Sequence, residues 1–146
     1  MVRHPSWVKY LCVAFSFIFL TGCPGVADYD LDLPGNYSVV RISAHDVNIS
    51  PKREFGYGPP VIRAKVTEVA WDDTYIITKQ VSLKPDPKSS NGYRIPDENN
   101  YRYWIIEFET GKLIGPLDDL GLAEKRAELQ IADDVELKNP REYLGK

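Results

Sequence analysis

A two-residue alternation of polar and apolar side chains is the feature that most restricts how this chain can fold. It is clearest at 28–33, where acidic and apolar residues alternate, and it returns at 61–71 and 101–110, while 74–81 follows as the hairpin partner of 61–71. Successive side chains of a β-strand point to opposite faces, so each run predicts a strand. The acidic pair at 72–73 between two of the runs is typical of a tight turn. The pattern therefore predicts hairpins and an antiparallel sheet.

The longest strand candidate changes phase part of the way along. Ile62 and Val66 share one face of the expected strand, whereas Val69 and Trp71 fall on the other. A slip of one residue is what a β-bulge introduces, because two residues then oppose one on the partner strand. We expect such a bulge near Glu68.

The evidence for helix is confined to the C-terminal part of the chain. The segment 116–119 has proline followed by acids, which suit a helix N-terminus, and Pro140 ends any continuation. The expected buried stripe at helical spacing consists of Leu120, Ala123, Ala127 and Ile131. The predicted fold class is mainly β (α+β): a single antiparallel sheet of about five to six strands, curled or packed on itself, with one C-terminal helix.

A long polar segment at 84–100 separates two strand candidates. It contains three prolines and one glycine and shows no periodicity. Loops of this length are uncommon in compact domains and are usually functional or disordered. A tolerated surface insertion is the alternative interpretation.

The N-terminal segment has the parts of a secretory signal. Arg3 and Lys9 are its only charged residues, and an uncharged apolar run follows at 11–20. This run is about half of the roughly 20 residues that a transmembrane helix needs. Its end, Leu20-Thr21-Gly22-Cys23, matches the bacterial lipobox, in which the cysteine receives diacylglycerol and becomes the new N-terminus. We expect a protein anchored by acyl chains such as palmitate.

This interpretation divides the chain into three parts. Residues 1–22 are the signal peptide, residues 23–27 are the lipidated cysteine and a short tether, and residues 28–146 are one β-rich globular domain. The expected location is the cell membrane or the outer membrane, on the extracytoplasmic side. The sequence leaves open which of the two membranes holds the anchor.

Charge and cysteine content exclude several classes of function. Removal of residues 1–22 leaves 16 basic and 21 acidic residues, so a nucleic-acid partner is not expected. Cys23 and His45 would be the only cysteine and histidine left in the mature chain. An intramolecular disulfide, a Cys/His zinc site and a catalytic Cys–His pair are thereby excluded, and neither a metal nor a cofactor is expected.

Two groups of residues invite a catalytic interpretation. Ser43, His45 and Asp46 form the only Ser/His/Asp cluster, but neighbours on one strand do not converge as a triad requires, and a histidine in a surface turn is favoured. The pairs at 72–73 and 107–109 have the carboxylates of a glycosidase, yet an acidic turn and a solvated strand face explain them more simply. We therefore expect a protein that is not an enzyme.

Aromatic residues gather around the predicted hairpins. Trp104 shares a face with apolar residues and is expected in the core. Tyr101 and Tyr103 share the face of a glutamate and are expected to be exposed, and with Trp71 and Tyr75 they are the candidate binding surface. Packing within the sheet is the alternative role for these side chains.

Several stretches carry a family resemblance. The lipobox at 20–23, the run LPGNYSVVR at 33–41, the stretch at 64–77, and the segments at 103–106 and 111–117 are similar to a bacterial family of small uncharacterised lipoproteins, domain of unknown function 3997. The resemblance implies a secreted, membrane-tethered domain. It carries over no catalytic residue.

The expected function is that of a membrane-anchored lipoprotein that binds or scaffolds outside the cytoplasm. Its partners would be the membrane, through covalent lipid at Cys23, and either a protein or a glycan of the cell envelope. The alternative is an inhibitor or immunity-type lipoprotein that blocks a partner enzyme with the 84–100 loop. A small hydrolase that uses carboxylates is a third class, and the oligomeric state is left open.

Overall fold

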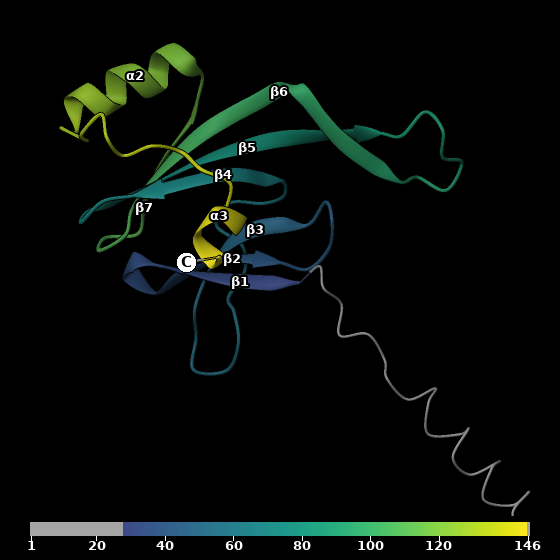
Figure 1. Ribbon diagram of the computed structural model, residues 1–146, viewed down its shortest axis with the longest axis horizontal. Helices are drawn as coiled ribbons and strands as arrows, with labels where there is room; N and C mark the ends of the chain where they lie inside the picture. Colours follow the sequence, from purple (N-terminus) through teal and green to yellow (C-terminus); the bar gives the residue numbers. More distant parts are fainter. Residues whose placement is uncertain (1–27, 146) are drawn as a thin grey trace, which may run out of the picture.

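Two antiparallel sheets, stacked face to face, form the body of the molecule (Figure 1). The computed structural model describes residues 28–145. The signal peptide, Cys23 and the tether, on which the anchoring prediction rests, lie outside these residues. The first sheet has the order β1-β2-β3 and consists of β1 (Tyr29–Leu33), β2 (Tyr37–Arg41) and β3 (Val47–Pro51).

The second sheet has four strands in the order β4-β5-β6-β7. These are β4 (Val66–Trp71), β5 (Tyr75–Pro85), β6 (Arg94–Glu107) and β7 (Lys112–Leu117). The predicted mainly β fold with antiparallel pairing is confirmed, and so is the expected bulge, which lies between Val66 and Glu68. The prediction of a single sheet is wrong, because β3 and β4 belong to different sheets.

The crossover between the sheets explains why β3 and β4 do not pair with each other. Ile62 pairs with Ile49 of β3 in an isolated bridge, and the chain then leaves that sheet before β4 begins. Pro59 and Pro60 precede this bridge and have no backbone N–H to donate to a ladder. The segment predicted as one strand from residue 61 to 71 is therefore a bridge in the first sheet followed by a shorter strand in the second.

The main core fills the space between the two sheets. Its fully buried members come from both layers: Val39 and Ile49 from the first sheet, Val69 and Ile76 from the second. Trp104 and Phe108 pack against this cluster, as expected for Trp104. Burial of large aliphatic and aromatic side chains on both inner faces provides the stabilisation that holds the sheets together.

A helix covers the outer face of the second sheet. Helix α2 (Asp119–Glu128) begins after Asp118, whose Oδ1 accepts a hydrogen bond from the Gly121 N–H at 2.8 Å. Its buried contact to the sheet is made by Leu122, and Leu120 is 76% exposed. The predicted start at residue 116 and the predicted stripe are wrong except at Ile131, because residues 116 and 117 belong to β7 and the helix begins later.

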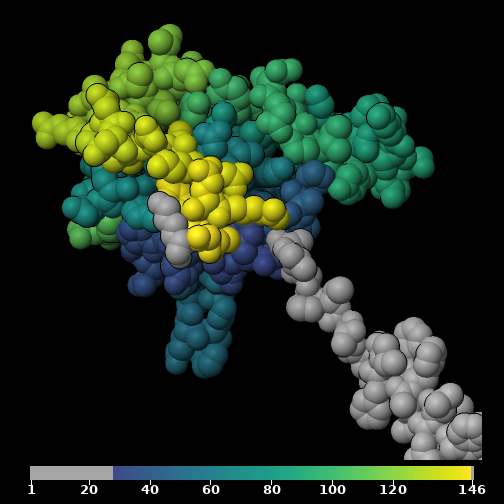
Figure 2. Space-filling view, in the orientation of Figure 1, coloured from purple at the N-terminus to yellow at the C-terminus, as the bar shows by residue number. Residues whose placement is uncertain are grey.

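The segment at 84–100 is not a loop but the outer part of a long hairpin. After a register shift between Val81 and Ser82, the pairing of β5 and β6 continues out to Pro85 and Arg94. Only residues 86–93 lie outside the strands. This outer hairpin, which we call the arm, projects from the body in Figures 1 and 2.

Short helical turns complete the fold. A 3-10 turn, η2 (Pro34–Asn36), joins β1 to β2, where proline, glycine and asparagine suit a tight turn. Helix α3 (Arg141–Leu144) places Tyr143 against Trp71, with ring centroids 4.6 Å apart, and its hydroxyl donates to the Val69 carbonyl at 3.1 Å. None of the helices within residues 28–145 has the length and apolar character needed to cross a bilayer.

Candidate functional site

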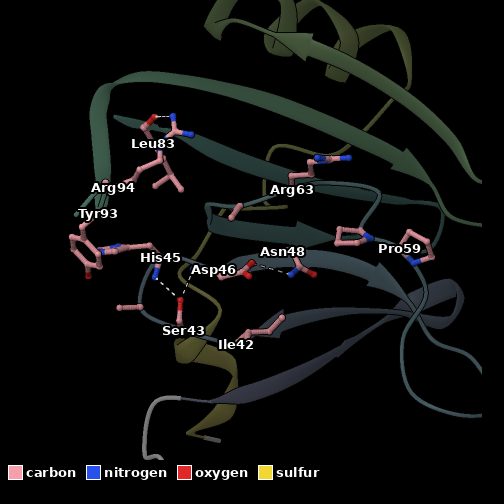
Figure 3. Close-up of a pocket in the computed structure, with 14 residues that line it drawn as sticks. Ile42, Ser43, His45, Asp46, Asn48, Pro59, Arg63, Leu83, Tyr93 and Arg94 are labelled. Carbon is pink, nitrogen blue, oxygen red and sulfur yellow. Dashed lines mark hydrogen bonds between the residues drawn. The ribbon is translucent and has the colours of Figure 1, made fainter. Parts of the chain in front are cut away.

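A cleft of about 860 Å³ opens beneath the arm. Segments that are distant in the sequence line it, chiefly the turn at 42–46, the crossover at 59–64 and the outer end of the arm at 92–94 (Figure 3). We call it the arm cleft. Its walls are more apolar than polar, with Ile42, Pro59 and Leu83 among them.

The turn between β2 and β3 gives the cleft a fixed floor. The Ile42 N–H donates to the Asp46 carbonyl at 2.9 Å, and this hydrogen bond closes the turn. Within it, the Ser43 Oγ accepts from the Asp46 N–H at 3.1 Å and from the His45 N–H at 3.4 Å. A serine that accepts from backbone groups two and three residues ahead is a local turn signal, so the sequence itself sets this conformation.

His45 is held against the arm. Its ring lies edge-on to the ring of Tyr93, with centroids 5.4 Å apart, and Figure 3 shows the two side by side. The Nδ1 atom of His45 is enclosed and has no hydrogen-bond partner among the described residues. Because a buried polar atom without a partner is costly, this nitrogen is an unsatisfied polar group in the wall of the cleft.

Two arginines give the cleft its charge. Arg63 comes from the crossover and Arg94 from the start of β6, and both are exposed at the cleft. Arg94 also donates to the Leu83 carbonyl, a contact that ties its side chain across the outer end of the arm. The one acidic residue of the lining, Asp46, accepts from the Asn48 side chain at 3.2 Å. The arrangement suits binding of a ligand that presents an acidic or otherwise electron-rich group beside an apolar part.

The Ser/His/Asp cluster lies in this cleft without forming a triad. Ser43, His45 and Asp46 share one turn, as sequence reasoning favoured, but the Ser43 oxygen is used by backbone N–H groups and the Asp46 carboxylate by Asn48. No hydrogen bond joins the His45 imidazole to either side chain in the part of the chain that the structure describes. The geometry required of a nucleophile, its base and the base's partner is absent from this turn.

The tyrosines of the candidate binding surface have a different role from the one expected. Tyr103 is 8% exposed, so the prediction that it faces solvent is wrong. Its hydroxyl donates to Asp119 Oδ1 at 3.0 Å, and that of Tyr101 donates to Asp119 Oδ2 at 2.9 Å. Glu107 lies on the same face of β6, and for this reason the sequence predicted a solvent-exposed face. In the structure, helix α2 covers that face at Tyr103. The two tyrosines bind the start of that helix to β6.

Burial and this carboxylate change the acidity of both phenols. Burial, followed by the hydrogen bond to Asp119, raises the pKa of Tyr103 well above its ordinary value. The pKa of Tyr101 is also raised, chiefly by its hydrogen bond to the same carboxylate. Both groups stay neutral donors over the physiological range.

Of the other two aromatic residues of the candidate surface, Tyr75 lies in the same cluster as Tyr101 and Tyr103, and Trp71 does not. Trp71 packs against the core between the sheets and against Tyr143, whereas Tyr75 packs against the cluster beneath α2. The structure brings Tyr101 and Tyr103 together, at 5.7 Å between centroids, but Trp71 belongs to a different core cluster. The four side chains therefore do not share one surface. Trp71 packs on the face of the second sheet that is turned to the first sheet, whereas the three tyrosines pack on the opposite face, beneath α2.

The carboxylates considered for catalysis have structural partners. Asp72 Oδ1 accepts from the Thr74 and Tyr75 N–H groups, each at 2.7 Å, and thereby closes the β4–β5 turn. Glu107 accepts from the Thr110 hydroxyl at the next turn. These contacts agree with the structural interpretation of both acidic pairs.

The arm cleft was not predicted from the sequence. Arg63, Tyr93 and Arg94 carry no motif, and Tyr93 and Arg94 were part of the expected loop. They meet His45 only because the extended β5–β6 ladder carries residue 94 back over the first sheet. Only a correct strand register for the arm would have revealed the site.

Comparison with known proteins yields a family without an assigned activity. Residues 34–141 match the model of a family described as "Protein of unknown function (DUF3997)". No curated protein and no solved structure matches the chain.

Proposed function

The chain belongs to the DUF3997 family, and from this premise we propose that it is a membrane-anchored lipoprotein that acts outside the cytoplasm as a non-catalytic binding module. The anchor is the lipid on Cys23, and the ligand binds in the arm cleft. The observation that carries the proposal is the cleft itself, with its unpartnered His45 nitrogen beside Tyr93 and two arginines. These groups offer recognition by hydrogen bonding, stacking and charge.

The lipobox supports the anchored location. The cysteine follows a leucine and two small residues directly after the apolar run, which is where a lipoprotein signal peptidase acts. Each buried methylene of an acyl chain contributes about 0.8 kcal/mol, so two or three chains hold a protein on a membrane almost permanently.

Labelling of growing cells with a palmitate analogue tests the anchor. The wild-type protein should carry the label, and Cys23→Ala should carry none, because no other residue accepts the acyl chains. A Cys12→Ala variant is the matched control and should be labelled like the wild type, since that residue lies within the expected signal peptide. Label that persists in Cys23→Ala would refute the proposed site.

A capture experiment tests the binding role of the cleft. Full-length lipoprotein purified in detergent is mixed with solubilised envelope from a strain that lacks it, and bound material is identified. His45→Ala and Arg63→Ala should each reduce recovery several-fold, whereas Glu124→Ala on the exposed side of α2 should not change it. Equal recovery by all four proteins would show that the cleft is not the binding site.

The structure also favours a second candidate, an inhibitor or immunity-type lipoprotein. The arm is paired out to Pro85 and Arg94 and projects from the body, which is how a rigid element enters a partner's active site (Figure 2). The capture experiment, repeated with alanine at the exposed tip residues Pro87 and Lys88, distinguishes the binding module from the inhibitor. Loss of capture with a tip variant that leaves His45 and Arg63 intact would favour the inhibitor.

A further inference from the structure

The tether joins the domain at the same end as the arm cleft. Strand β1 begins at Tyr29, which pairs with Arg41 at the end of β2, so Asp28 lies beside the turn at 42–46. Only residues 24–27 separate Cys23 from Asp28. Even a fully extended chain spans at most about 18 Å over this distance. An acylated Cys23 therefore brings this end of the domain, and not the opposite one, to the bilayer.

A second hollow on this end is basic. It has a volume of about 260 Å³ and lies on the other side of the same turn, with Ala44 lining both hollows. Its charged side chains are Arg41, Lys65 and Arg141, from β2, the crossover and α3, and no acidic residue lines it.

Tyr29 organises the two arginines of this hollow. The guanidinium carbons of Arg41 and Arg141 lie 5.7 and 5.9 Å from the centre of its ring. Arg41 also donates from Nε to the Ser43 carbonyl at 3.2 Å. These cation–π contacts leave N–H groups at the edges of both guanidinium planes available to an anion.

Among residues 28–145, Arg41, Lys65 and Arg141 form no ion pair with an acidic side chain. Each ion pair described between residues 28 and 145 uses a lysine, and Lys65 is in none of them. With the arginines of the arm cleft, five cations lie on this end of a chain whose formal net charge is −3. We call the set the tether-end surface; it comprises Arg41, Arg63, Lys65, Arg94 and Arg141.

We propose that the tether-end surface docks on an anionic lipid surface and holds the domain against the bilayer in one orientation. This inference rests on the proposed lipid anchor at Cys23. Phosphate headgroups would bind the guanidinium and ammonium groups, and Ile42, which is 60% exposed, and Tyr93 would reach the headgroup boundary. The covalent lipid supplies the first membrane contact and the basic surface the second.

The short tether is why a bilayer fits better than a soluble acidic partner. A large partner would have to enter the space between this end and the membrane, which the length of residues 24–27 restricts to less than about 18 Å. The bilayer already occupies that position.

Site-specific fluorescence tests the orientation on the lipidated full-length product. The mature chain has no cysteine apart from Cys23, so Ala44→Cys or Glu109→Cys supplies a single reactive thiol. Ala44 lies in the turn of the tether-end surface, whereas Glu109 lies in the β6–β7 turn near the opposite end, where Phe108 meets Gly35. Each variant is labelled with a polarity-sensitive dye and reconstituted into vesicles of phosphatidylcholine, with or without phosphatidylglycerol.

In vesicles with phosphatidylglycerol, a quencher in the lipid headgroup region should quench the dye at position 44 at least threefold more than the dye at position 109. High salt, or omission of phosphatidylglycerol, should abolish most of this difference, because screening weakens exposed ion pairs. Equal quenching at the two positions in anionic vesicles would overturn the proposal. The proposal would also be overturned if the dye at position 44 were shielded from solvent in native membranes but not in vesicles of anionic lipid. A membrane protein, and not the lipid, would then cover this end.

Charge variants identify the residues responsible. Arg41→Gln/Lys65→Gln/Arg141→Gln should lose the preference for anionic vesicles, and Lys112→Gln/Lys125→Gln/Lys138→Gln, which removes the same charge elsewhere, should keep it. Mass spectrometry of each sample reads out the acyl chains on Cys23. Missing acyl chains would refute the proposed anchor, whereas acylated protein without the quenching difference would refute only the docking.

Discussion

Gly35 in the turn between β1 and β2 shows how closely the two sheets approach each other. Its φ of +67° lies in the left-handed region, and a β-carbon there would stand 2.5 Å from the Cβ of Phe108, which directly follows β6 of the other sheet. The residue therefore meets two requirements that any larger side chain would violate, one from the backbone and one from packing.

Gly35→Ala should consequently lower the free energy of unfolding by about 3 kcal/mol, with part of the loss due to φ and the rest to displacement of Phe108. Gly92→Ala is the matched control, because it has a φ of +77° but open space around the β-carbon position, and it should cost only about 1 kcal/mol. Urea denaturation of both variants measures the difference. Equal losses would show that Phe108 does not constrain this turn.

Tyr103 makes alkaline stability sensitive to a single hydroxyl. Burial and the Asp119 carboxylate raise the pKa of this phenol, so the unfolded state releases its proton at a lower pH than the folded state. The resulting stabilisation is complete below the ordinary tyrosine pKa of about 10 and is lost as the pH rises through the raised folded value.

The free energy of unfolding of the wild type should therefore fall more steeply between about pH 9 and pH 11 than that of Tyr103→Phe. At neutral pH the variant should be about 1 kcal/mol less stable, because the hydrogen bond to Asp119 is gone. Chemical denaturation at the two pH values gives both quantities. Parallel pH profiles would contradict this assignment.

At the scale of elements, helix α2 is fixed to the sheet by a small number of contacts. Leu122 is 9% exposed and packs with Ile77, Ile105 and Tyr103, whereas Leu120 points to solvent. Leu122→Ala should lower the free energy of unfolding by about 2 kcal/mol, and Leu120→Ala should change it by less than about 0.5 kcal/mol. Thermal denaturation of the pair measures this contrast. A larger loss of stability for Leu120→Ala than for Leu122→Ala would show that the helix buries the face containing Leu120, as the sequence predicted.

The sequence predicted strands better than it predicted what covers them. The run at 28–33 alternates clearly, and the phase slip at 61–71 correctly placed the bulge near Glu68. Ile76 and Ile77 are adjacent and both fully buried, because the second sheet is covered on one face by the first sheet and on the other by α2. Two-sided burial leaves little alternation, so the sequence did not reveal that Tyr103 lies beneath a helix.

The arm cleft could not be predicted for a different reason. Its residues come from three segments, and their meeting depends on the register of the ladder between Ser82 and Arg94. Prolines and polar residues in this stretch lack an alternating pattern, so the local signal was that of a loop. Pairing with a neighbouring strand, which is a non-local effect, determines the structure here.

On the scale of the whole molecule, the arm cleft and the tether-end surface lie at the end where the described chain begins. The register of β1 with β2 brings the start of the domain beside the turn that separates the cleft from the basic hollow. The proposed lipid anchor on Cys23 would convert this placement into an orientation relative to the bilayer. A ligand of the cleft would accordingly be bound at the membrane surface.

Intact-mass spectrometry of the protein isolated from its native cells tests the lipid anchor most directly. The account predicts a chain that starts at Cys23 and carries the added mass of diacylglycerol, with residues 1–22 removed. A product that retains Met1 and Cys12 and has an unmodified thiol at Cys23 would contradict it.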